Sequence, residues 1–176
     1  MKSKIIKTKD FILRPLYLSD AESVAKHAHN RIISRNMARF PYPYKKRDAE
    51  VWLRRVVNYQ RRKKQANIVF GIEIDGGIVG AINMHRIVPG HKAEIGYWIG
   101  KEYWGRGLMS KVIKEVVSYG FRELKLKRIT AKVFPFNKAS MRVLEKNHFK
   151  FEGILKKEEK KGNKYLDTHV YAKVRK

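Results

Sequence analysis

The sequence of 176 residues contains no cysteine, only five prolines and few acidic residues. Without cysteine, the chain cannot form a disulfide scaffold, a thiolate metal site or a cysteine acyl-enzyme. No segment approaches the roughly 18 apolar residues of a membrane span. The basic start, MKSKIIKTKD, lacks the apolar stretch of a secretory signal. These absences predict a cytoplasmic protein without a membrane partner.

The scarcity of acidic residues leaves a large positive charge. Lys and Arg number 41 against 16 Asp and Glu, which gives a net charge of +25. Such a surface attracts polyanions, among them nucleic acid, acidic protein, anionic lipid and phosphorylated cofactors. Hydrophobic residues make up 43% of the chain, enough for a real core. We expect one domain over residues 1–176.

Hydrophobic periodicity and turn signals predict the element order β α α β β β α β α β β. A Ser19–Glu22 capping box predicts a helix to about residue 33, and Asp48 is expected to cap the next helix. Three consecutive strands followed by a strand–helix–strand crossover predict a mixed sheet with one parallel pair. Strands are expected at 5–16, 68–74, 78–87, 93–99, 128–134, 149–157 and 164–174, and the helices after the first at 49–65, 107–124 and 137–147.

The most informative segment is Tyr-Trp-Gly-Arg-Gly-Leu-Met-Ser at residues 103–110, which joins a strand to a helix. The first turn of a helix has unpaired backbone N–H groups and a partial positive charge, and glycines allow a ligand to approach closely. Together these features predict a pyrophosphate site. A tight turn that binds nothing remains the alternative. A Rossmann loop fits poorly because Ser110 replaces its third glycine, and a P-loop is excluded.

At this point the sequence resembles the GCN5-related N-acetyltransferases (GNAT), and within them the RimJ/RimL-like branch, which acetylates ribosomal-protein N-termini. The resemblance starts at Leu13-Arg14-Pro15 and Asp20-Ala21 and passes through the aromatic loop 40–44. It is strongest in two segments, AEIGYWIGKEYWGRGLMSKVIKEVV and PFNKASMRVLEKNHFKFEG, between residues 93 and 153. It implies a GNAT-like α/β fold with a mostly antiparallel sheet of about seven strands. Helices would cover both faces, and the parallel pair would splay around the cofactor.

The resemblance also implies that acetyl-CoA is the cosubstrate, and it implies no metal. The family's motif A maps onto Trp104, Gly107 and Met109, of which only Gly107 matches the strict consensus; the other two substitutions are common in the RimJ/RimL-like branch. Asn137 matches the asparagine that binds pantetheine, although it could simply cap a helix. The remaining implied cofactor contacts lie on a strand edge and in the loop, at Tyr97, Trp98, Ile99, Gly105, Arg106, Leu108 and Ser110.

Acetylation of an amine needs a neutral amine, stabilisation of the tetrahedral oxyanion and a proton for the thiolate. Without cysteine, direct attack in a ternary complex is the natural mechanism. The resemblance places the oxyanion at a backbone N–H near Trp98 or Ile99. Ser140 matches the residue that hydrogen-bonds the sulfur in Rim-type sequences. The tyrosine acid of many relatives is replaced by Leu144.

Three residues are candidate general bases. Glu94 lies on the strand beside the cofactor but could be an ordinary exposed strand residue. Glu159 lies in a charge run that is usually a solvated face, although the RimL-like pattern places a substrate-binding carboxylate there. His85 could act through water, although a lone histidine on a strand is more often structural.

Nine basic residues crowd the segment 45–64, more than a cofactor phosphate site requires. A second hypothesis is therefore a nucleic-acid-binding module, or an acetyltransferase that docks on ribosomal RNA through this basic patch. Aromatic residues nearby could stack on bases, but core or acceptor-cleft roles are favoured for Phe40, Tyr42, Tyr44 and Tyr59. Our main prediction is an N-acetyltransferase acting on a protein N-terminus, with a small amine or a lysine as the alternative acceptor.

Overall fold

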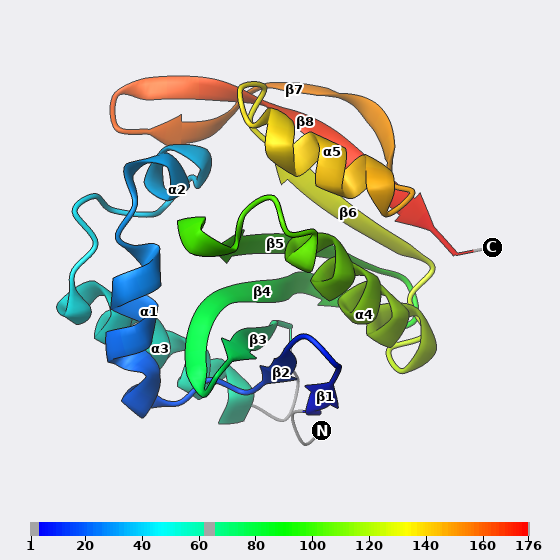
Figure 1. Cartoon of the computed structure of the whole chain (residues 1–176). Coiled ribbons are helices and arrows are strands. Elements are labelled where there is room, and N and C mark those ends of the chain that lie inside the picture. Colours follow the sequence, from blue (N-terminus) through cyan, green and yellow to red (C-terminus); the bar gives the residue numbers. More distant parts are fainter. Residues whose placement is uncertain (1–3, 62–65, 176) are drawn as a thin grey trace.

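The structure is a computed structural model that describes residues 4–61 and 66–175. Its centre is an eight-stranded sheet in the order β1-β2-β3-β4-β5-β6-β8-β7. Figure 1 shows helices packed around the sheet. The strands are β1 (Ile6–Lys7), β2 (Ile12–Arg14), β3 (Ile68–Ile74), β4 (Gly77–Val88), β5 (Lys92–Ile99), β6 (Arg128–Val133), β7 (Lys150–Lys161) and β8 (Lys164–Val174). The α-helices are α1 (Ala21–Ala28), α2 (Arg31–Asn36), α3 (Lys46–Arg61), α4 (Leu108–Arg122) and α5 (Lys138–Lys146).

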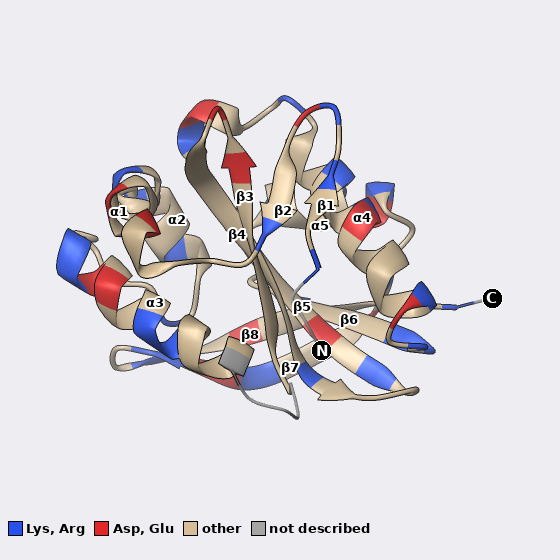
Figure 2. Cartoon of the chain, turned by 90° about the horizontal axis from the view of Figure 1, so that it is seen from below, with Lys and Arg blue, Asp and Glu red and all other residues tan. Residues whose placement is uncertain are grey.

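The sheet is mostly antiparallel, and β5 and β6 form its parallel pair. Helix α4 connects these two strands, as the predicted crossover requires. In Figure 2, helices α1 to α3 lie on one side of the sheet and α4 and α5 on the other. The expected fold, with a mixed sheet, one parallel pair and helices on both faces, is therefore confirmed.

Alternation along the strands produces two hydrophobic cores, one on each face of the sheet. On β3, Phe70 and Ile72 pack with residues of α4, whereas Val69 joins the core beneath α1 and α3. On β5, Ile95 and Ile99 face α4 and Trp98 faces the other helices. Because neighbouring residues of β5 point to opposite faces, this strand contributes side chains to both sides of the sheet.

Four local details differ from the sequence predictions. The expected first strand is two short strands, because Thr8 Oγ1 accepts the N–H groups of Asp10 and Phe11 and forms a turn between them. The helix expected to about residue 33 ends at Ala28, because Asn30 caps a separate helix, α2, by accepting the N–H groups of Ile32 and Ile33.

The predicted Ser19–Glu22 capping box is also wrong, because Asp20 stands between them as the residue before α1. Its carboxylate accepts the Tyr17 N–H at 2.8 Å and two bonds from the guanidinium of Arg14. Asp48 does not precede its helix either. It lies in the first turn of α3 and accepts the Lys45 N–H at 2.8 Å. The predicted end of that helix, residues 62–65, lies outside the described residues.

Candidate active site

The parallel strands β5 and β6 part halfway along their length. They pair from Lys92–Arg128 to Ile95–Ala131, and the pairing then stops although both strands continue. Beyond Ile95, strand β5 is hydrogen-bonded only on its β4 side within the described sheet. The parting leaves a free strand edge in the middle of the sheet.

Tyr97 and Ile99 direct their backbone groups toward this free edge. The Gly100 N–H donates to the Val79 carbonyl at 2.8 Å, so alternate residues, Trp98 included, face β4. The Ile99 carbonyl is already engaged, because the indole Nε1 of Trp104 donates to it at 2.8 Å. An extended ligand that binds along this edge could therefore form hydrogen bonds with the backbone N–H and carbonyl of Tyr97 and with the N–H of Ile99.

Helix α4 begins at Gly107, next to the parted strands. Gly105 and Gly107 have φ values of 75° and 71°, the left-handed region that glycine tolerates best. A Cβ atom at either position would meet no atom within 4 Å, so open space lies in front of both residues. In the described chain no backbone acceptor outside the helix pairs with the amides of residues 108–110. The geometry fits an anion held by the helix N-terminus.

A hydroxyl pair lies between β5 and α5. Tyr97 Oη is 2.7 Å from Ser140 Oγ, and Ser140 N–H donates to the side-chain oxygen of Asn137 at 3.2 Å. Asn137 thus caps α5, as the sequence allowed, and its amide NH2 makes no hydrogen bond within the described residues. Burial raises the pKa of the Tyr97 phenol well above its ordinary value, so the phenol stays protonated at neutral pH.

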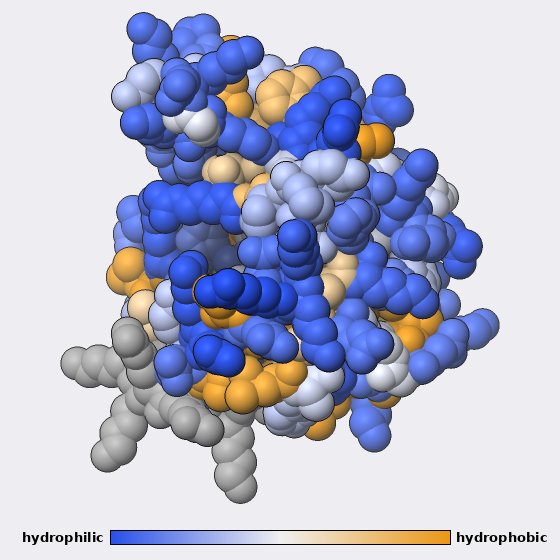
Figure 3. Space-filling model, turned by 90° about the vertical axis from the view of Figure 1, so that its left-hand side faces the viewer, coloured by the Kyte–Doolittle hydropathy of each residue, from blue (hydrophilic) through white to orange (hydrophobic). Residues whose placement is uncertain are grey.

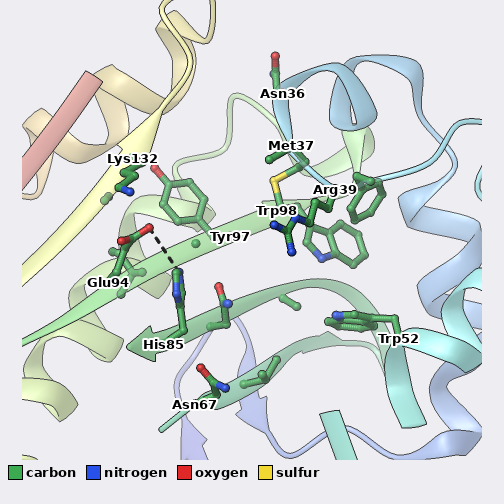
Figure 4. Close-up of a pocket in the computed structure, with 18 of the residues that line it drawn as sticks. Asn36, Met37, Arg39, Trp52, Asn67, His85, Glu94, Tyr97, Trp98 and Lys132 are labelled. Carbon is green, nitrogen blue, oxygen red and sulfur yellow. Dashed lines mark ion pairs between the residues drawn. The ribbon is translucent and has the colours of Figure 1, made fainter. Parts of the chain in front are cut away.

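A cavity of about 830 Å³ connects this hydroxyl pair with the opposite face of the sheet. Its lining includes Ser140 and Asn137 from the α5 side and Trp52 from α3 on the other side. Figure 4 shows Tyr97, His85 and Glu94 around one end of this cavity and Trp52 and Arg39 toward the other. The cavity therefore reaches residues on both faces of the sheet.

The cavity contains a cluster of ionisable groups on β4 and β5. Glu94 is 3.7 Å from His85 Nε2 and 3.2 Å from the guanidinium of Arg86. Burial lowers the pKa of His85, and the cations Arg86 and Lys132 lower it further, although Glu94 opposes them. His85 is therefore neutral at pH 7 and has a ring nitrogen that can accept a proton.

Glu159 reaches the same cavity from strand β7. It follows an irregular stretch of the β7–β8 pairing, after which Glu159 pairs with Leu166 and Lys161 with Lys164. Because residues two apart share a face of a strand, Glu159 and Lys161 point the same way. The Lys161 ammonium donates to the carbonyls of Ser34, Arg35 and Met37, which fastens the hairpin to the end of α2.

Aromatic side chains form another part of the cavity wall. Phe40 stacks on Tyr44 at 4.6 Å between ring centroids and meets Trp98 edge-on at 5.8 Å. Phe40, Tyr44 and Tyr59 line the cavity, whereas Tyr42 is exposed and lies under the guanidinium of Arg31. Figure 3 shows that the surface on this side of the molecule is largely hydrophilic, with hydrophobic residues between the charged ones.

The structure brings six of the fourteen sequence-predicted site residues to this cavity. Glu94, Tyr97, Trp98, Asn137, Ser140 and Glu159 line it. The loop residues Trp104, Gly105, Arg106, Gly107, Leu108, Met109 and Ser110 are not among its lining residues and surround the start of α4 instead. Met109 is buried in the core, and the Ser110 hydroxyl accepts a bond from Asn147, so those two side chains are structural.

Sequence reasoning missed the role of the Tyr97 side chain, which it treated only as part of a strand edge. The signal was present, because alternation along β5 puts Tyr97 on the α4–α5 face together with Ile95. It also missed Lys161 and Arg39. No sequence pattern marks those two, since their positions depend on how the C-terminal hairpin and the 37–45 loop meet α2.

Comparison with known proteins decides the family. The sequence model described as "Acetyltransferase (GNAT) domain" matches residues 10–150. The chain belongs to the GNAT acetyltransferase family. A GNAT relative, "Probable N-acetyltransferase YjcK" of Bacillus subtilis, is 36% identical over 176 residues and covers 96% of both chains. The "Ribosomal-protein-serine acetyltransferase" of Escherichia coli is 28% identical over 144 residues, covering 71% of this chain and 80% of its own.

A solved GNAT structure has the same fold. "RimL- Ribosomal L7/L12 alpha-N-protein acetyltransferase in complex with Coenzyme A" superposes with a TM-score of 0.85 at 22% identity. The match covers 97% of this chain and 98% of that chain. The predicted RimJ/RimL-like resemblance and the acetyl-CoA cosubstrate are thus confirmed. The chain is a GNAT acetyltransferase that takes its acetyl group from acetyl-CoA.

The residues present fit that cosubstrate. The open space before Gly105 and Gly107 and the unpaired amides at the start of α4 suit a diphosphate. The free edge of β5 suits an amide-bearing arm that adds to a sheet like a strand. Within the described residues, no cluster of three metal-ligating side chains is present, and no helix is long and apolar enough to cross a membrane.

Proposed function

We propose that this chain acetylates the N-terminal α-amine of a protein, with a ribosomal protein as the first candidate. The observation that carries the proposal is the cavity that passes from Ser140 on one face of the sheet to Trp52 on the other. The names of the Escherichia coli relative and of the RimL structure support a ribosomal acceptor. An α-amine, with a pKa near ~8, also requires less help from a base than lysine, near ~10.4.

On the cosubstrate side, the amides of residues 108–110 would hold the diphosphate and the β5 edge would hold the pantetheine arm. Asn137 would add a hydrogen bond through its amide NH2, which the helix cap leaves available. The Ile99 N–H faces the free edge and is the donor we assign to the developing oxyanion, in preference to Trp98, which faces β4. Acetyl-CoA supplies an activated thioester to this arrangement.

On the acceptor side, Glu159 would receive the amine, because no hydrogen bond or ion pair occupies its carboxylate within the described residues. Glu94 is already paired with Arg86 at 3.2 Å, so its carboxylate is less available to the amine than that of Glu159. His85 is neutral and lies beside Glu94, so the pair would remove the proton of the ammonium through water. The neutral amine then attacks the thioester carbon. The C–S bond breaks, the Ser140 hydroxyl supplies a proton to the leaving sulfur, and the second proton that the nitrogen releases returns to Ser140 through water.

Mass spectrometry with isotope-labelled acetyl-CoA tests the proposed acceptor. One peptide carries a free α-amine and no lysine, and the matched peptide carries a blocked N-terminus and one lysine. The proposal expects label on the α-amine of the first peptide and little on the second. Label confined to the lysine, or to small amines alone, would overturn it. Glu159→Gln should raise the KM for the peptide, and Glu94→Gln should lower kcat.

A further inference from the structure

Three arginines line the acceptor end of the cavity and have no acidic partner. Arg47 and Arg55 are on α3, and Arg39 lies in the loop after α2. All three are exposed, and no ion pair or hydrogen bond joins their side chains to another residue in the described ranges 4–61 and 66–175. By contrast, the cations nearer the reaction centre are paired: Arg86 with Glu94 and Lys132 with Glu158.

None of the described acidic residues that line the cavity pairs with these arginines, which outnumber the one carboxylate beside them, Asp48. Glu94 is bound by Arg86, and Asp48 accepts the Lys45 N–H inside the first turn of α3. Glu159 is on β7, where the proposed function assigns it to the amine. The acceptor end therefore keeps a positive charge that only a ligand or counterions from solvent can balance. Figure 4 shows Arg39 well separated from Glu94, at the far end of the site from the ionisable cluster.

The distance between Arg47 and Arg55 along α3 corresponds to the length of a short extended peptide. Arg47, Val51 and Arg55 are four residues apart on α3, and all three line the cavity, so they form one stripe along the helix. Eight residues of helix rise about 12 Å. Roughly four residues of extended chain cover the same length. Val51 and Trp52 lie between the two charges and offer apolar contact to the peptide.

We infer that the acceptor is an acidic N-terminal segment, with carboxylate side chains in its first few residues that bind Arg39, Arg47 and Arg55. This inference rests on the proposed function for the direction of the chain, since it puts the α-amine at Glu159. Planar guanidinium groups bind carboxylates with two parallel hydrogen bonds, which gives them an advantage over lysine at such a site. The arginines would thus recognise the acidic side chains that follow the N-terminal residue, whereas Glu159 would bind the α-amine itself.

Two peptides that differ only in charge test the inference. Both begin with serine; one carries two glutamates within residues 2–5 and the other carries two glutamines there. Binding is measured by fluorescence anisotropy and α-acetylation by mass spectrometry, each at low and at high salt. We expect about tenfold higher kcat/KM and tighter binding for the acidic peptide, with a difference that shrinks as salt is added.

A matched pair of variants separates a specific site from general positive charge. Arg54 neighbours Arg55 on α3 and is also exposed, but it does not line the cavity. Arg55→Gln should remove most of the preference for the acidic peptide, and Arg54→Gln should keep it. Arg55→Glu should turn the preference toward a peptide with lysines in place of the glutamates.

Equal binding of the acidic and neutral peptides by the unaltered protein would overturn the inference, and so would equal effects of Arg54→Gln and Arg55→Gln. If the two peptides bind equally and an RNA oligonucleotide binds in a way that depends on Arg55, the arginines on α3 bind nucleic acid instead. Anisotropy decides these outcomes even when neither peptide is acetylated. Arginine-dependent binding without α-acetylation would contradict the proposed function alone.

Discussion

The phenol oxygen of Tyr97 lies 2.7 Å from the hydroxyl oxygen of Ser140. Ser140 has one hydroxyl proton, and it can offer that proton to the thioester sulfur only when Tyr97 donates to Ser140 Oγ. Because burial raises the Tyr97 pKa, the phenol keeps its proton and remains a donor at neutral pH. We therefore propose that Tyr97 is a positioning residue that orients Ser140, the proposed acid.

Removing the hydroxyl of Ser140 or of Tyr97 should lower kcat, because both affect the proposed protonation of the leaving sulfur. We expect Ser140→Ala to reduce kcat by about 100-fold, the low end for general acid catalysis. Tyr97→Phe should reduce kcat by about tenfold and leave acetyl-CoA binding, followed by calorimetry, nearly unchanged. The double variant should be no slower than Ser140→Ala, because Tyr97 acts through Ser140. Multiplied losses in the double variant would contradict this coupling.

A side chain at Gly107 should prevent acetyl-CoA binding. Gly107→Val forces a β-branched residue to φ 71° and places its methyl groups in the space before the α4 amides. Gly90→Val is a matched control, because Gly90 also has a φ of 71° and open space around its missing Cβ. Both variants should lose about 1–2 kcal/mol of stability from backbone strain. Only Gly107→Val should lose the rise in Tm on adding acetyl-CoA. An equal rise in both variants would show that no anion binds there.

Lys161 should matter for the acceptor more than for the cosubstrate. Its ammonium donates to Met37 O at 2.7 Å and to Arg35 O at 3.0 Å, and desolvation lowers its pKa. Lys161→Met leaves these carbonyls without their donor, which should cost about 2 kcal/mol, or roughly 4–8 °C in Tm. The peptide KM should rise several-fold, with acetyl-CoA affinity unchanged.

The neighbouring Lys160 provides the control for this prediction. Lys160 is exposed, and its ammonium lies 5.8 Å from the centre of the Tyr165 ring. Lys160→Met should change both Tm and the peptide KM only slightly. If both methionine variants behaved alike, the three carbonyl contacts would have no special role in shaping the acceptor site.

His85 should make the protein less stable in mild acid. Its pKa is lowered in the folded state, mainly by burial, whereas an unfolded histidine has a pKa near ~6.5. Below that pH the unfolded chain takes up the proton first, so stability falls until the pH reaches the folded pKa. The unaltered protein should therefore lose more Tm between pH 7.5 and 5.5 than His85→Gln does. Identical losses would show that His85 titrates normally in the folded protein.

The sequence predicted most of the elements in their order because local signals define them, but it merged β1 with β2 and α1 with α2. Asp75-Gly76-Gly77 indicated the β3–β4 hairpin, and periodic apolar residues indicated α4. Helix ends were less predictable. Ser19 and Asp48 are both plausible caps by type, but Asp20 pairs with Arg14 and the Asp48 carboxylate reaches back to Lys45, and these contacts decide the boundaries.

The site was predictable where one segment carries it and unpredictable where distant segments meet. Asn137 and Ser140 could be proposed because the single segment that contains both resembles the corresponding segment of the GNAT family. The contact of Lys161 with Met37 spans 124 residues and depends on how the hairpin folds over α2, which no local pattern shows. The charge of Arg55 was visible in the sequence, but its place in the cavity follows only from the packing of α3.

The separation of β5 from β6 after Ile95 has a consequence for the order of events during turnover. If the acceptor and the acetyl donor enter from opposite faces of the sheet, the acetylated peptide and free coenzyme A can also leave from opposite faces. Neither the acetylated peptide nor free coenzyme A would then have to wait for the other to leave. An inhibitor that joins a peptide to coenzyme A through an acetyl bridge would have to thread through the gap from one end, so it should associate slowly and dissociate more slowly still.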